Sequence, residues 1–132
     1  MYAVTLACLA LLLNTGAVNS PLAVVPADHT VEIVDNGKEV QLARGDSLNV
    51  RLPAQLGTGY GWYVTSGPGR RLQHTNQRPK IETNKDSTPG SSEVEVFQFV
   101  ARRSGRVSLA FRYGRPRNTA TLKTFHITVV IQ

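Results

Sequence analysis

Cysteine is almost absent from this chain of 132 residues, which has a single one at position 8. Cys8 precedes most of the apolar run over residues 3–13, whereas a lipid-modified cysteine would follow such a run, so we do not expect a lipoprotein. Residues 28–132 have no cysteine at all. Disulfides, thiol catalysis and cysteine metal sites are therefore excluded for that part of the chain.

The first 27 residues also lack Asp, Glu, Lys and Arg. Their apolar run, A-V-T-L-A-C-L-A-L-L-L, is too short to span a bilayer as a helix, and small residues suited to cleavage follow it. This pattern predicts a signal peptide over residues 1–27, with cleavage somewhere in 17–27, and a domain over 28–132. The alternative is an uncleaved hydrophobic tail. We expect a secreted or periplasmic protein with no membrane span after removal of the leader.

Acidic residues are fewer than basic ones, 9 against 15, which gives a net charge of +6 carried entirely downstream of the leader. A basic surface favours acidic partners. The arginine pairs at 70–71 and 102–103 are isolated, however, and no block of five like charges occurs. No nucleic-acid partner is indicated, and binding to anionic polymers or surfaces stays open as a weaker alternative.

Helical periodicity is missing after the leader, and alternation with period two takes its place. The Asn-Gly pair within residues 35–38 predicts a two-residue hairpin turn between the first two strands. Near Val96 and Phe97 the alternation changes phase, which predicts a bulge or a strand end. Short strands separated by turn signals predict an all-β, immunoglobulin-like antiparallel β-sandwich. The predicted strands cover residues 30–33, 40–42, 47–52, 62–65, 80–83, 93–101, 107–113 and 125–131.

Patterns that would indicate an enzyme are missing as well. His29, His74 and His126 are far apart in the sequence, and His126 is expected to face away from the core. We find no metal-ligand spacing, no nucleophile elbow and no obvious carboxylate pair. We expect no enzymatic activity, no metal and no cofactor.

Two short motifs are open to misreading. The glycines of residues 57–61 are spaced G-x-G-x-G and precede a strand, so they do not form a dinucleotide fingerprint. The integrin-type tripeptide Arg44-Gly45-Asp46 is interpreted as a tight turn between two strands.

Three loops are richer in glycine, proline and serine than turns require, namely residues 55–61, 89–92 and 113–117. Loops of a sandwich cluster at its two ends, so loops distant in sequence can form one contact surface. The alternative is structural: the glycines relieve a strained corner, and Arg115-Pro116 fixes a turn.

In their order and spacing these loops resemble those of the chagasin family, protein inhibitors of papain-like cysteine peptidases. The first loop of that family reads Asn-Pro-Thr-Thr-Gly-(Tyr or Phe)-x-Trp. Residues 55–62, Q-L-G-T-G-Y-G-W, keep its second Thr, its Gly, its aromatic residue and its Trp. The second motif, G-x-x-G, falls on residues 90–93, G-S-S-E, and the third, R-P-aromatic, falls on residues 115–117, R-P-R.

The resemblance extends from about residue 30 to residue 132 and implies a reversible, tight-binding, monomeric inhibitor whose three loops occlude the peptidase cleft. Thr58 and Gly59 would lie nearest the catalytic cysteine, whereas Trp62 is expected to pack beneath the loop. The alternative is a non-inhibitory secreted binding or assembly module on the same scaffold. The implied peptidase-binding residues are Leu56, Gly57, Thr58, Gly59, Tyr60, Gly90, Ser91, Ser92, Arg115, Pro116 and Arg117.

Overall fold

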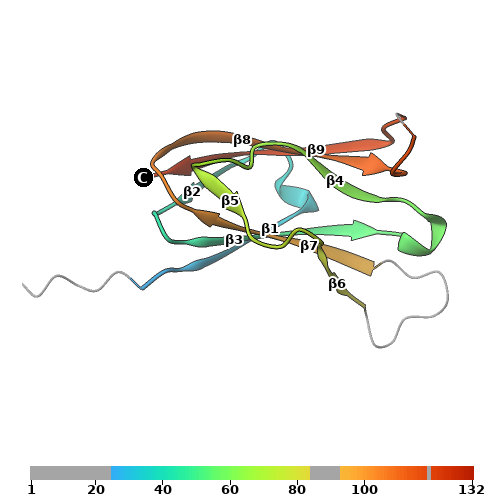
Figure 1. The fold of residues 1–132 in the computed structure, drawn as a ribbon, viewed down its shortest axis with the longest axis horizontal. Helices are drawn as coiled ribbons and strands as arrows, with labels where there is room; N and C mark the ends of the chain where they lie inside the picture. The colour runs from blue at the N-terminus through green and yellow to red at the C-terminus, as the bar shows by residue number, and fades with distance from the viewer. Residues whose placement is uncertain (1–24, 84–92, 119) are drawn as a thin grey trace, which may run out of the picture.

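Two β-sheets face each other in the computed structural model, which describes residues 25–83, 93–118 and 120–132 (Figure 1). The strands are β1 (Asp28–Glu32), β2 (Glu39–Leu42), β3 (Ser47–Ala54), β4 (Gly61–Ser66), β5 (Leu72–His74), β6 (Lys80–Glu82), β7 (Glu93–Ala101), β8 (Gly105–Gly114) and β9 (Lys123–Ile131). Sheet A has the order β1-β3-β7-β5, with β6 also paired to β7, and sheet B has the order β2-β9-β8-β4. The predicted sandwich is therefore confirmed.

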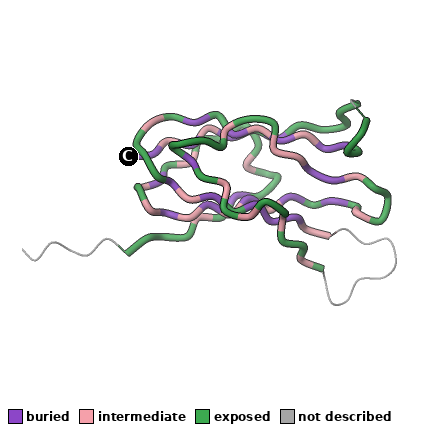
Figure 2. The backbone as a smooth tube through the Cα atoms, viewed as in Figure 1, coloured by how far each residue is buried: buried purple, intermediate pink, exposed green. Residues whose placement is uncertain are grey.

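The core lies between the sheets and is formed by the inward residues of the strands other than β6 (Figure 2). Aromatic rings dominate its centre, where Phe111 contacts Phe97 with ring centroids 5.0 Å apart and Phe125 at 5.9 Å. This packing, together with the sheet hydrogen bonds, holds the domain without disulfides. The largest fully buried side chains are Phe99, Phe111, Phe125, Leu42, Leu48, Leu52, Leu72, Leu109, Ile127, Val50 and Val129.

The sheets are not purely antiparallel, because β1 pairs with β3 and β2 pairs with β9 in parallel. The predicted hairpin at residues 35–38 is therefore wrong. The 3-10 helix η1 (Ile33–Asp35) carries the chain from sheet A to sheet B instead. The Asn36 side chain accepts a hydrogen bond from the His126 amide at 2.9 Å, and the Gly37 amide donates to the His126 carbonyl at 2.7 Å. These bonds direct the turn towards β9 and away from β1.

The predicted bulge near Val96 is also wrong. The pairing of β3 with β7 runs without a register shift from Ser47 opposite Val100 to Ala54 opposite Glu93. The apparent change of phase arises because Glu95 occupies an inward position and is only 3% exposed. A buried carboxyl group therefore stands where the pattern required an apolar side chain.

The two ends of the sandwich carry different connections. Residues 55–60, 114–118 and 120–122 lie at the end on the right of Figure 1, where β6 ends and β7 begins. The turns at 43–46, 67–71 and 102–104 lie at the opposite end. Among the described residues, no helix has the length and apolar character needed to cross a membrane.

Candidate functional site

The first loop is built on a single turn of 3-10 helix, η2 (Leu56–Thr58), with Gln55 as its N-cap. The amides of Thr58 and Gly59 donate to the carbonyls of Gln55 and Leu56 at 3.1 and 3.0 Å. Gly59 then takes a left-handed conformation with φ of 81°, which a residue with a side chain adopts only with strain. The loop therefore has a defined shape that depends on glycine at position 59.

Three hydrogen bonds involve Gln55 and Trp62 and fix the two ends of this loop. The Gln55 amide donates to the Tyr113 hydroxyl oxygen at 3.1 Å, and the Trp62 indole Nε1 donates to the Pro53 carbonyl at 2.9 Å. The Trp62 amide donates to Glu95 Oε2 at 3.1 Å. Trp62 is 4% exposed, so the prediction that it packs beneath the loop is confirmed. Sequence reasoning did not identify the supporting roles of Tyr113 and Pro53.

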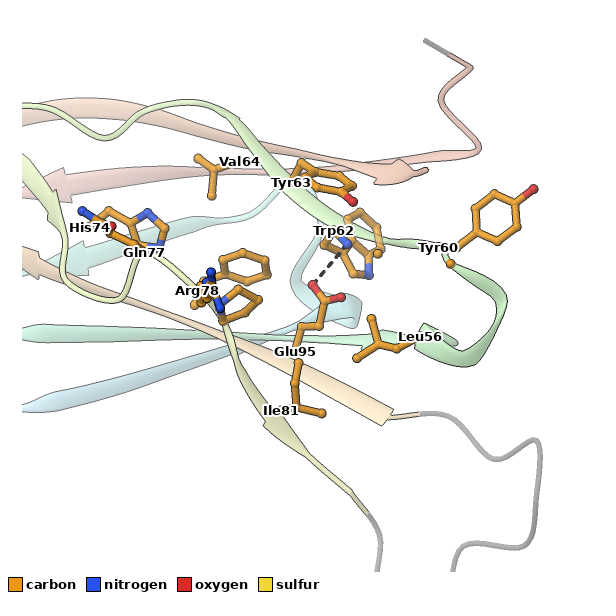
Figure 3. Close-up of a pocket in the computed structure, with 14 residues that line it drawn as sticks. Leu56, Tyr60, Trp62, Tyr63, Val64, His74, Gln77, Arg78, Ile81 and Glu95 are labelled. Carbon is orange, nitrogen blue, oxygen red and sulfur yellow. Dashed lines mark hydrogen bonds between the residues drawn. The ribbon is translucent and has the colours of Figure 1, made fainter. Parts of the chain in front are cut away.

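The buried Glu95 side chain links the two sheets, because it reaches from β7 in sheet A to β4, the edge strand of sheet B (Figure 3). The free side of β4 leaves the Trp62 amide without a ladder partner, and the carboxylate supplies one. Gly61 fits against the same group, since a Cβ at that position would lie 2.8 Å from Glu95 Oε1. Burial raises the pKa of Glu95 to about 7, although the Trp62 hydrogen bond acts in the opposite direction. The break in alternation was the signal that could have found this residue.

Arg115 joins the third loop to the first. Its guanidinium lies over the Tyr60 ring, 4.7 Å from the centroid, and its Nη2 donates to the Thr58 carbonyl at 3.4 Å. Tyr60 in turn stacks on Tyr113 with centroids 5.9 Å apart. The Arg115 side chain thus braces the first loop from within the protein.

The predicted site residues fall into distinct groups. Gly57, Thr58, Pro116 and Arg117 are exposed, whereas Leu56 is partly buried and packs against the core. A Cβ at position 57 would meet no atom within 4 Å, so Gly57 is not required by the loop itself. The second-loop residues Gly90, Ser91 and Ser92 lie outside the described residues.

Depressions flank the first loop on both sides. One, of about 580 Å³, lies towards β6 and β7 and is lined by Tyr60, Trp62, Ile81 and Glu95 among others (Figure 3). The other, of about 450 Å³, lies towards the β8–β9 loop and includes Leu122. The loop therefore stands as a ridge between two hollows.

The Arg44-Gly45-Asp46 tripeptide forms a turn, as interpreted from the sequence. Asp46 is 4% exposed, and its carboxylate accepts hydrogen bonds from the amides of Ala27 and Ala43 at 3.0 and 2.9 Å. These amide bonds hold the pKa of Asp46 below its usual value. Because the carboxylate is used internally, it is unavailable to an integrin.

The histidines are dispersed in the structure as well. His29 contacts Asp46 at 3.0 Å, His74 stacks on Phe99, and His126 is exposed as expected. Within residues 25–83, 93–118 and 120–132, no group of three His, Cys, Asp or Glu side chains is arranged to hold a metal ion.

A rigid β-sandwich that presents braced loops at one end is the architecture of a binding protein. Residues 41–129 match the model of the chagasin family of peptidase inhibitors. Because this match covers more than half of the chain, the protein belongs to that family. The family consists of inhibitors, which confirms the prediction that the protein is not an enzyme.

Several solved structures share this fold. The cysteine protease inhibitor EhICP2 from Entamoeba histolytica superposes with a TM-score of 0.70 at 19% identity, over 80% of this chain and 96% of that one. Amebosin superposes with a TM-score of 0.65 at 22% identity, over 82% of this chain and 100% of amebosin. PbICP-C, solved in complex with falcipain-2, superposes with a TM-score of 0.52 at 18% identity, over 81% of this chain and 91% of PbICP-C. No curated protein sequence matches the chain.

Proposed function

We propose that this protein is a reversible, tight-binding inhibitor of papain-like cysteine peptidases and that its first loop occupies the active-site cleft. The observation that carries this proposal is the bracing of residues 55–62 at both ends and from Arg115. Membership of the peptidase inhibitor family supports it. So does the likeness to EhICP2, which is described as a cysteine protease inhibitor, and to PbICP-C, which is bound to falcipain-2.

The mechanism follows from the shape of the loop. Gly57 and Thr58 are exposed at its tip, and Gly57 has open space around its Cα, so backbone can approach backbone within a narrow cleft. The 3-10 turn and the left-handed Gly59 differ from the extended conformation of a peptide substrate. A cleft filled in this way denies the catalytic cysteine the alignment that acyl transfer needs, and the loop is not cut.

Preorganisation explains tight binding. Since the Gln55, Trp62 and Arg115 contacts already fix the loop in the free protein, docking orders few additional groups and costs little conformational entropy. Pro116 and Arg117 are exposed beside the loop and form the flanking contact on one side. The family motif also assigns Gly90, Ser91 and Ser92, which lie outside the described residues, to the contact with the peptidase.

We further propose that the protein is exported through its leader to a secreted or periplasmic location, acts there as a monomer, and binds one peptidase through one loop set. Residues 1–27 carry no charged side chain and contain the apolar run 3–13, which supports export. The intact mass of the protein recovered from the culture medium or periplasm tests this proposal. A protein that keeps residue 1 and stays in the cytoplasm would contradict it.

Substitutions at the two ends of the sandwich separate inhibition from the alternative of a non-inhibitory binding or assembly module. Thr58→Ala removes a hydroxyl that donates to the Gln55 carbonyl at 2.5 Å and should weaken inhibition of papain at least tenfold, whereas Thr58→Ser should retain it. Arg44→Gln, at the opposite end, is the matched control and should leave inhibition unchanged. Asp46 is unsuitable as a control because its carboxylate supports the fold. Equal effects of Thr58→Ala and Arg44→Gln would favour the alternative module.

A further inference from the structure

The end of the sandwich opposite the first loop gathers six exposed arginines, which we call the arginine end. Backbone hydrogen bonds hold its turns together: the amides of Arg102 and Arg103 donate to the Arg71 carbonyl at 2.7 and 3.3 Å, and the Gly45 amide donates to the Ala101 carbonyl at 2.7 Å. The arginine pairs at 70–71 and 102–103, which are far apart in the sequence, therefore lie side by side. The arginine end comprises Arg44, Arg70, Arg71, Arg102, Arg103 and Arg106.

Acidic groups compensate this charge only in part. Glu39 Oε2 accepts hydrogen bonds from Arg106 Nη1 and Nη2 at 2.9 and 3.0 Å, and the Asp46 carboxylate is buried behind the turn. Asp28, at the start of β1, is exposed. In the described part of the chain, the guanidinium groups of Arg44, Arg70 and Arg103 form no hydrogen bond or ion pair (Arg71 and Arg102 bond to Ser104 and Gln73). Like charges gathered without partners repel one another, and a bound anion would reduce this repulsion.

The composition of the arginine end narrows the chemistry of that anion. All six cations are arginines, whose planar guanidinium groups bind phosphate oxygens in pairs more effectively than lysine does. Arg70, Arg71 and Arg106 line a shallow depression of about 290 Å³ with the backbone of Gly67 and Gly69. No aromatic side chain belongs to the three turns at 43–46, 67–71 and 102–104, so these turns offer no platform on which nucleic acid bases would stack.

The distribution of the arginines favours a membrane as the source of the phosphates. Arg44, Arg70 and Arg103 belong to three different turns, and of these three only Arg70 lines the depression. The three turns lie together at one end of the sandwich (Figure 1), so a surface that carries many phosphate groups can contact all of them at once.

We propose that the arginine end docks on an anionic phospholipid surface and leaves the first loop facing away from it. β7, whose nine residues run the length of the sandwich, separates the two ends by about 25 Å. Both contacts can therefore form at once, and the docked protein presents its first loop to soluble partners. This proposal does not depend on the proposed inhibition, because binding to lipid is measured without a peptidase.

The experiment measures co-sedimentation of the exported, purified protein with phosphatidylcholine vesicles that do or do not contain phosphatidylglycerol. We expect binding only to the anionic vesicles, and we expect it to weaken as salt rises. Replacing Arg44, Arg70 and Arg103 by Gln removes three unpartnered cations and should lower the apparent affinity about 100-fold.

A control variant removes the same charge elsewhere, with Gln at Lys38, Arg78 and Lys80, and should lose less than about fivefold. Both variants should keep the urea midpoint of the parent, since none of the six side chains is buried. Equal losses in the two variants would reduce the effect to net charge and overturn the proposal. Failure to bind anionic vesicles would overturn it too, as would retention on heparin without vesicle binding, which would assign the arginine end to a sulfated polymer.

Discussion

Glu95→Gln tests the link between a buried acid and the first loop. Glutamine has nearly the same shape, and its side-chain oxygen can still accept the Trp62 amide, so the loop geometry should survive the substitution. What disappears is the ionisable group. The structure raises the pKa of Glu95 from 4.5 to about 7 because the carboxyl group is buried.

The sign of the effect follows from linkage. A raised pKa means that folding favours the protonated form, so the contribution of Glu95 to stability is fully present below pH 4.5 and is lost as the pH rises through 7. A difference of about 2.5 units corresponds to about 3 kcal/mol of unfolding free energy. Because the adjoining hollow admits water, screening should reduce this loss to about 2 kcal/mol.

Urea unfolding followed by Trp62 fluorescence at pH 4.5 and pH 8.5 provides the assay. Burial lowers the pKa of His74, so the His74 contribution is present above pH 6.5 and is lost as the pH falls, opposite to that of Glu95. The parent alone therefore shows a mixed slope, whereas the difference between parent and variant isolates Glu95. The variant should gain about 2 kcal/mol over the parent at pH 8.5 and nothing at pH 4.5. A difference that does not change with pH would refute the reasoning.

Four further substitutions probe the loops. Gly59→Ala forces a side chain into a left-handed conformation and should lower the free energy of unfolding by about 1–2 kcal/mol in thermal unfolding, with loss of much of the inhibition. Gly57→Ala should weaken inhibition alone, and equal losses of stability in the two variants would contradict this assignment. Tyr113→Phe removes the oxygen that accepts the Gln55 amide and should lower stability by about 1 kcal/mol and inhibition severalfold; an unchanged inhibition constant would show that the brace is unimportant. Arg117→Trp restores the aromatic residue of the family motif and should strengthen inhibition, and weaker or equal inhibition would argue against that placement.

Most strands of the fold could be predicted from the sequence, because alternating side chains report directly which face of a strand is buried. The pattern did not reveal the partner of each strand. Side chains alternate with period two in both parallel and antiparallel pairs, so the parallel pairing of β1 with β3 could not be inferred from the sequence. β5 was missed as well, since Leu72 is its one fully buried residue within a polar segment.

The site was predictable to a similar degree. The glycines of the first loop, and Trp62 beneath it, follow from the local sequence. The supporting contacts of Glu95 with Trp62 and of Arg115 with Tyr60 do not, because they join residues that are 33 and 55 positions apart. A charged side chain at an inward position breaks the alternation in the same way as a bulge does, and only the three-dimensional structure distinguishes the two.

Titration of papain and of a cathepsin-L-type peptidase with the purified protein tests the central claim most directly. Hydrolysis of a fluorogenic substrate reports free peptidase, and mass spectrometry of the mixture reports whether the first loop is cut. We predict sub-micromolar, reversible inhibition of at least one of the two enzymes, with the protein recovered intact. A folded sample that leaves both enzymes fully active, or that is cleaved within residues 55–62, would contradict the claim that this loop is a preorganised inhibitor.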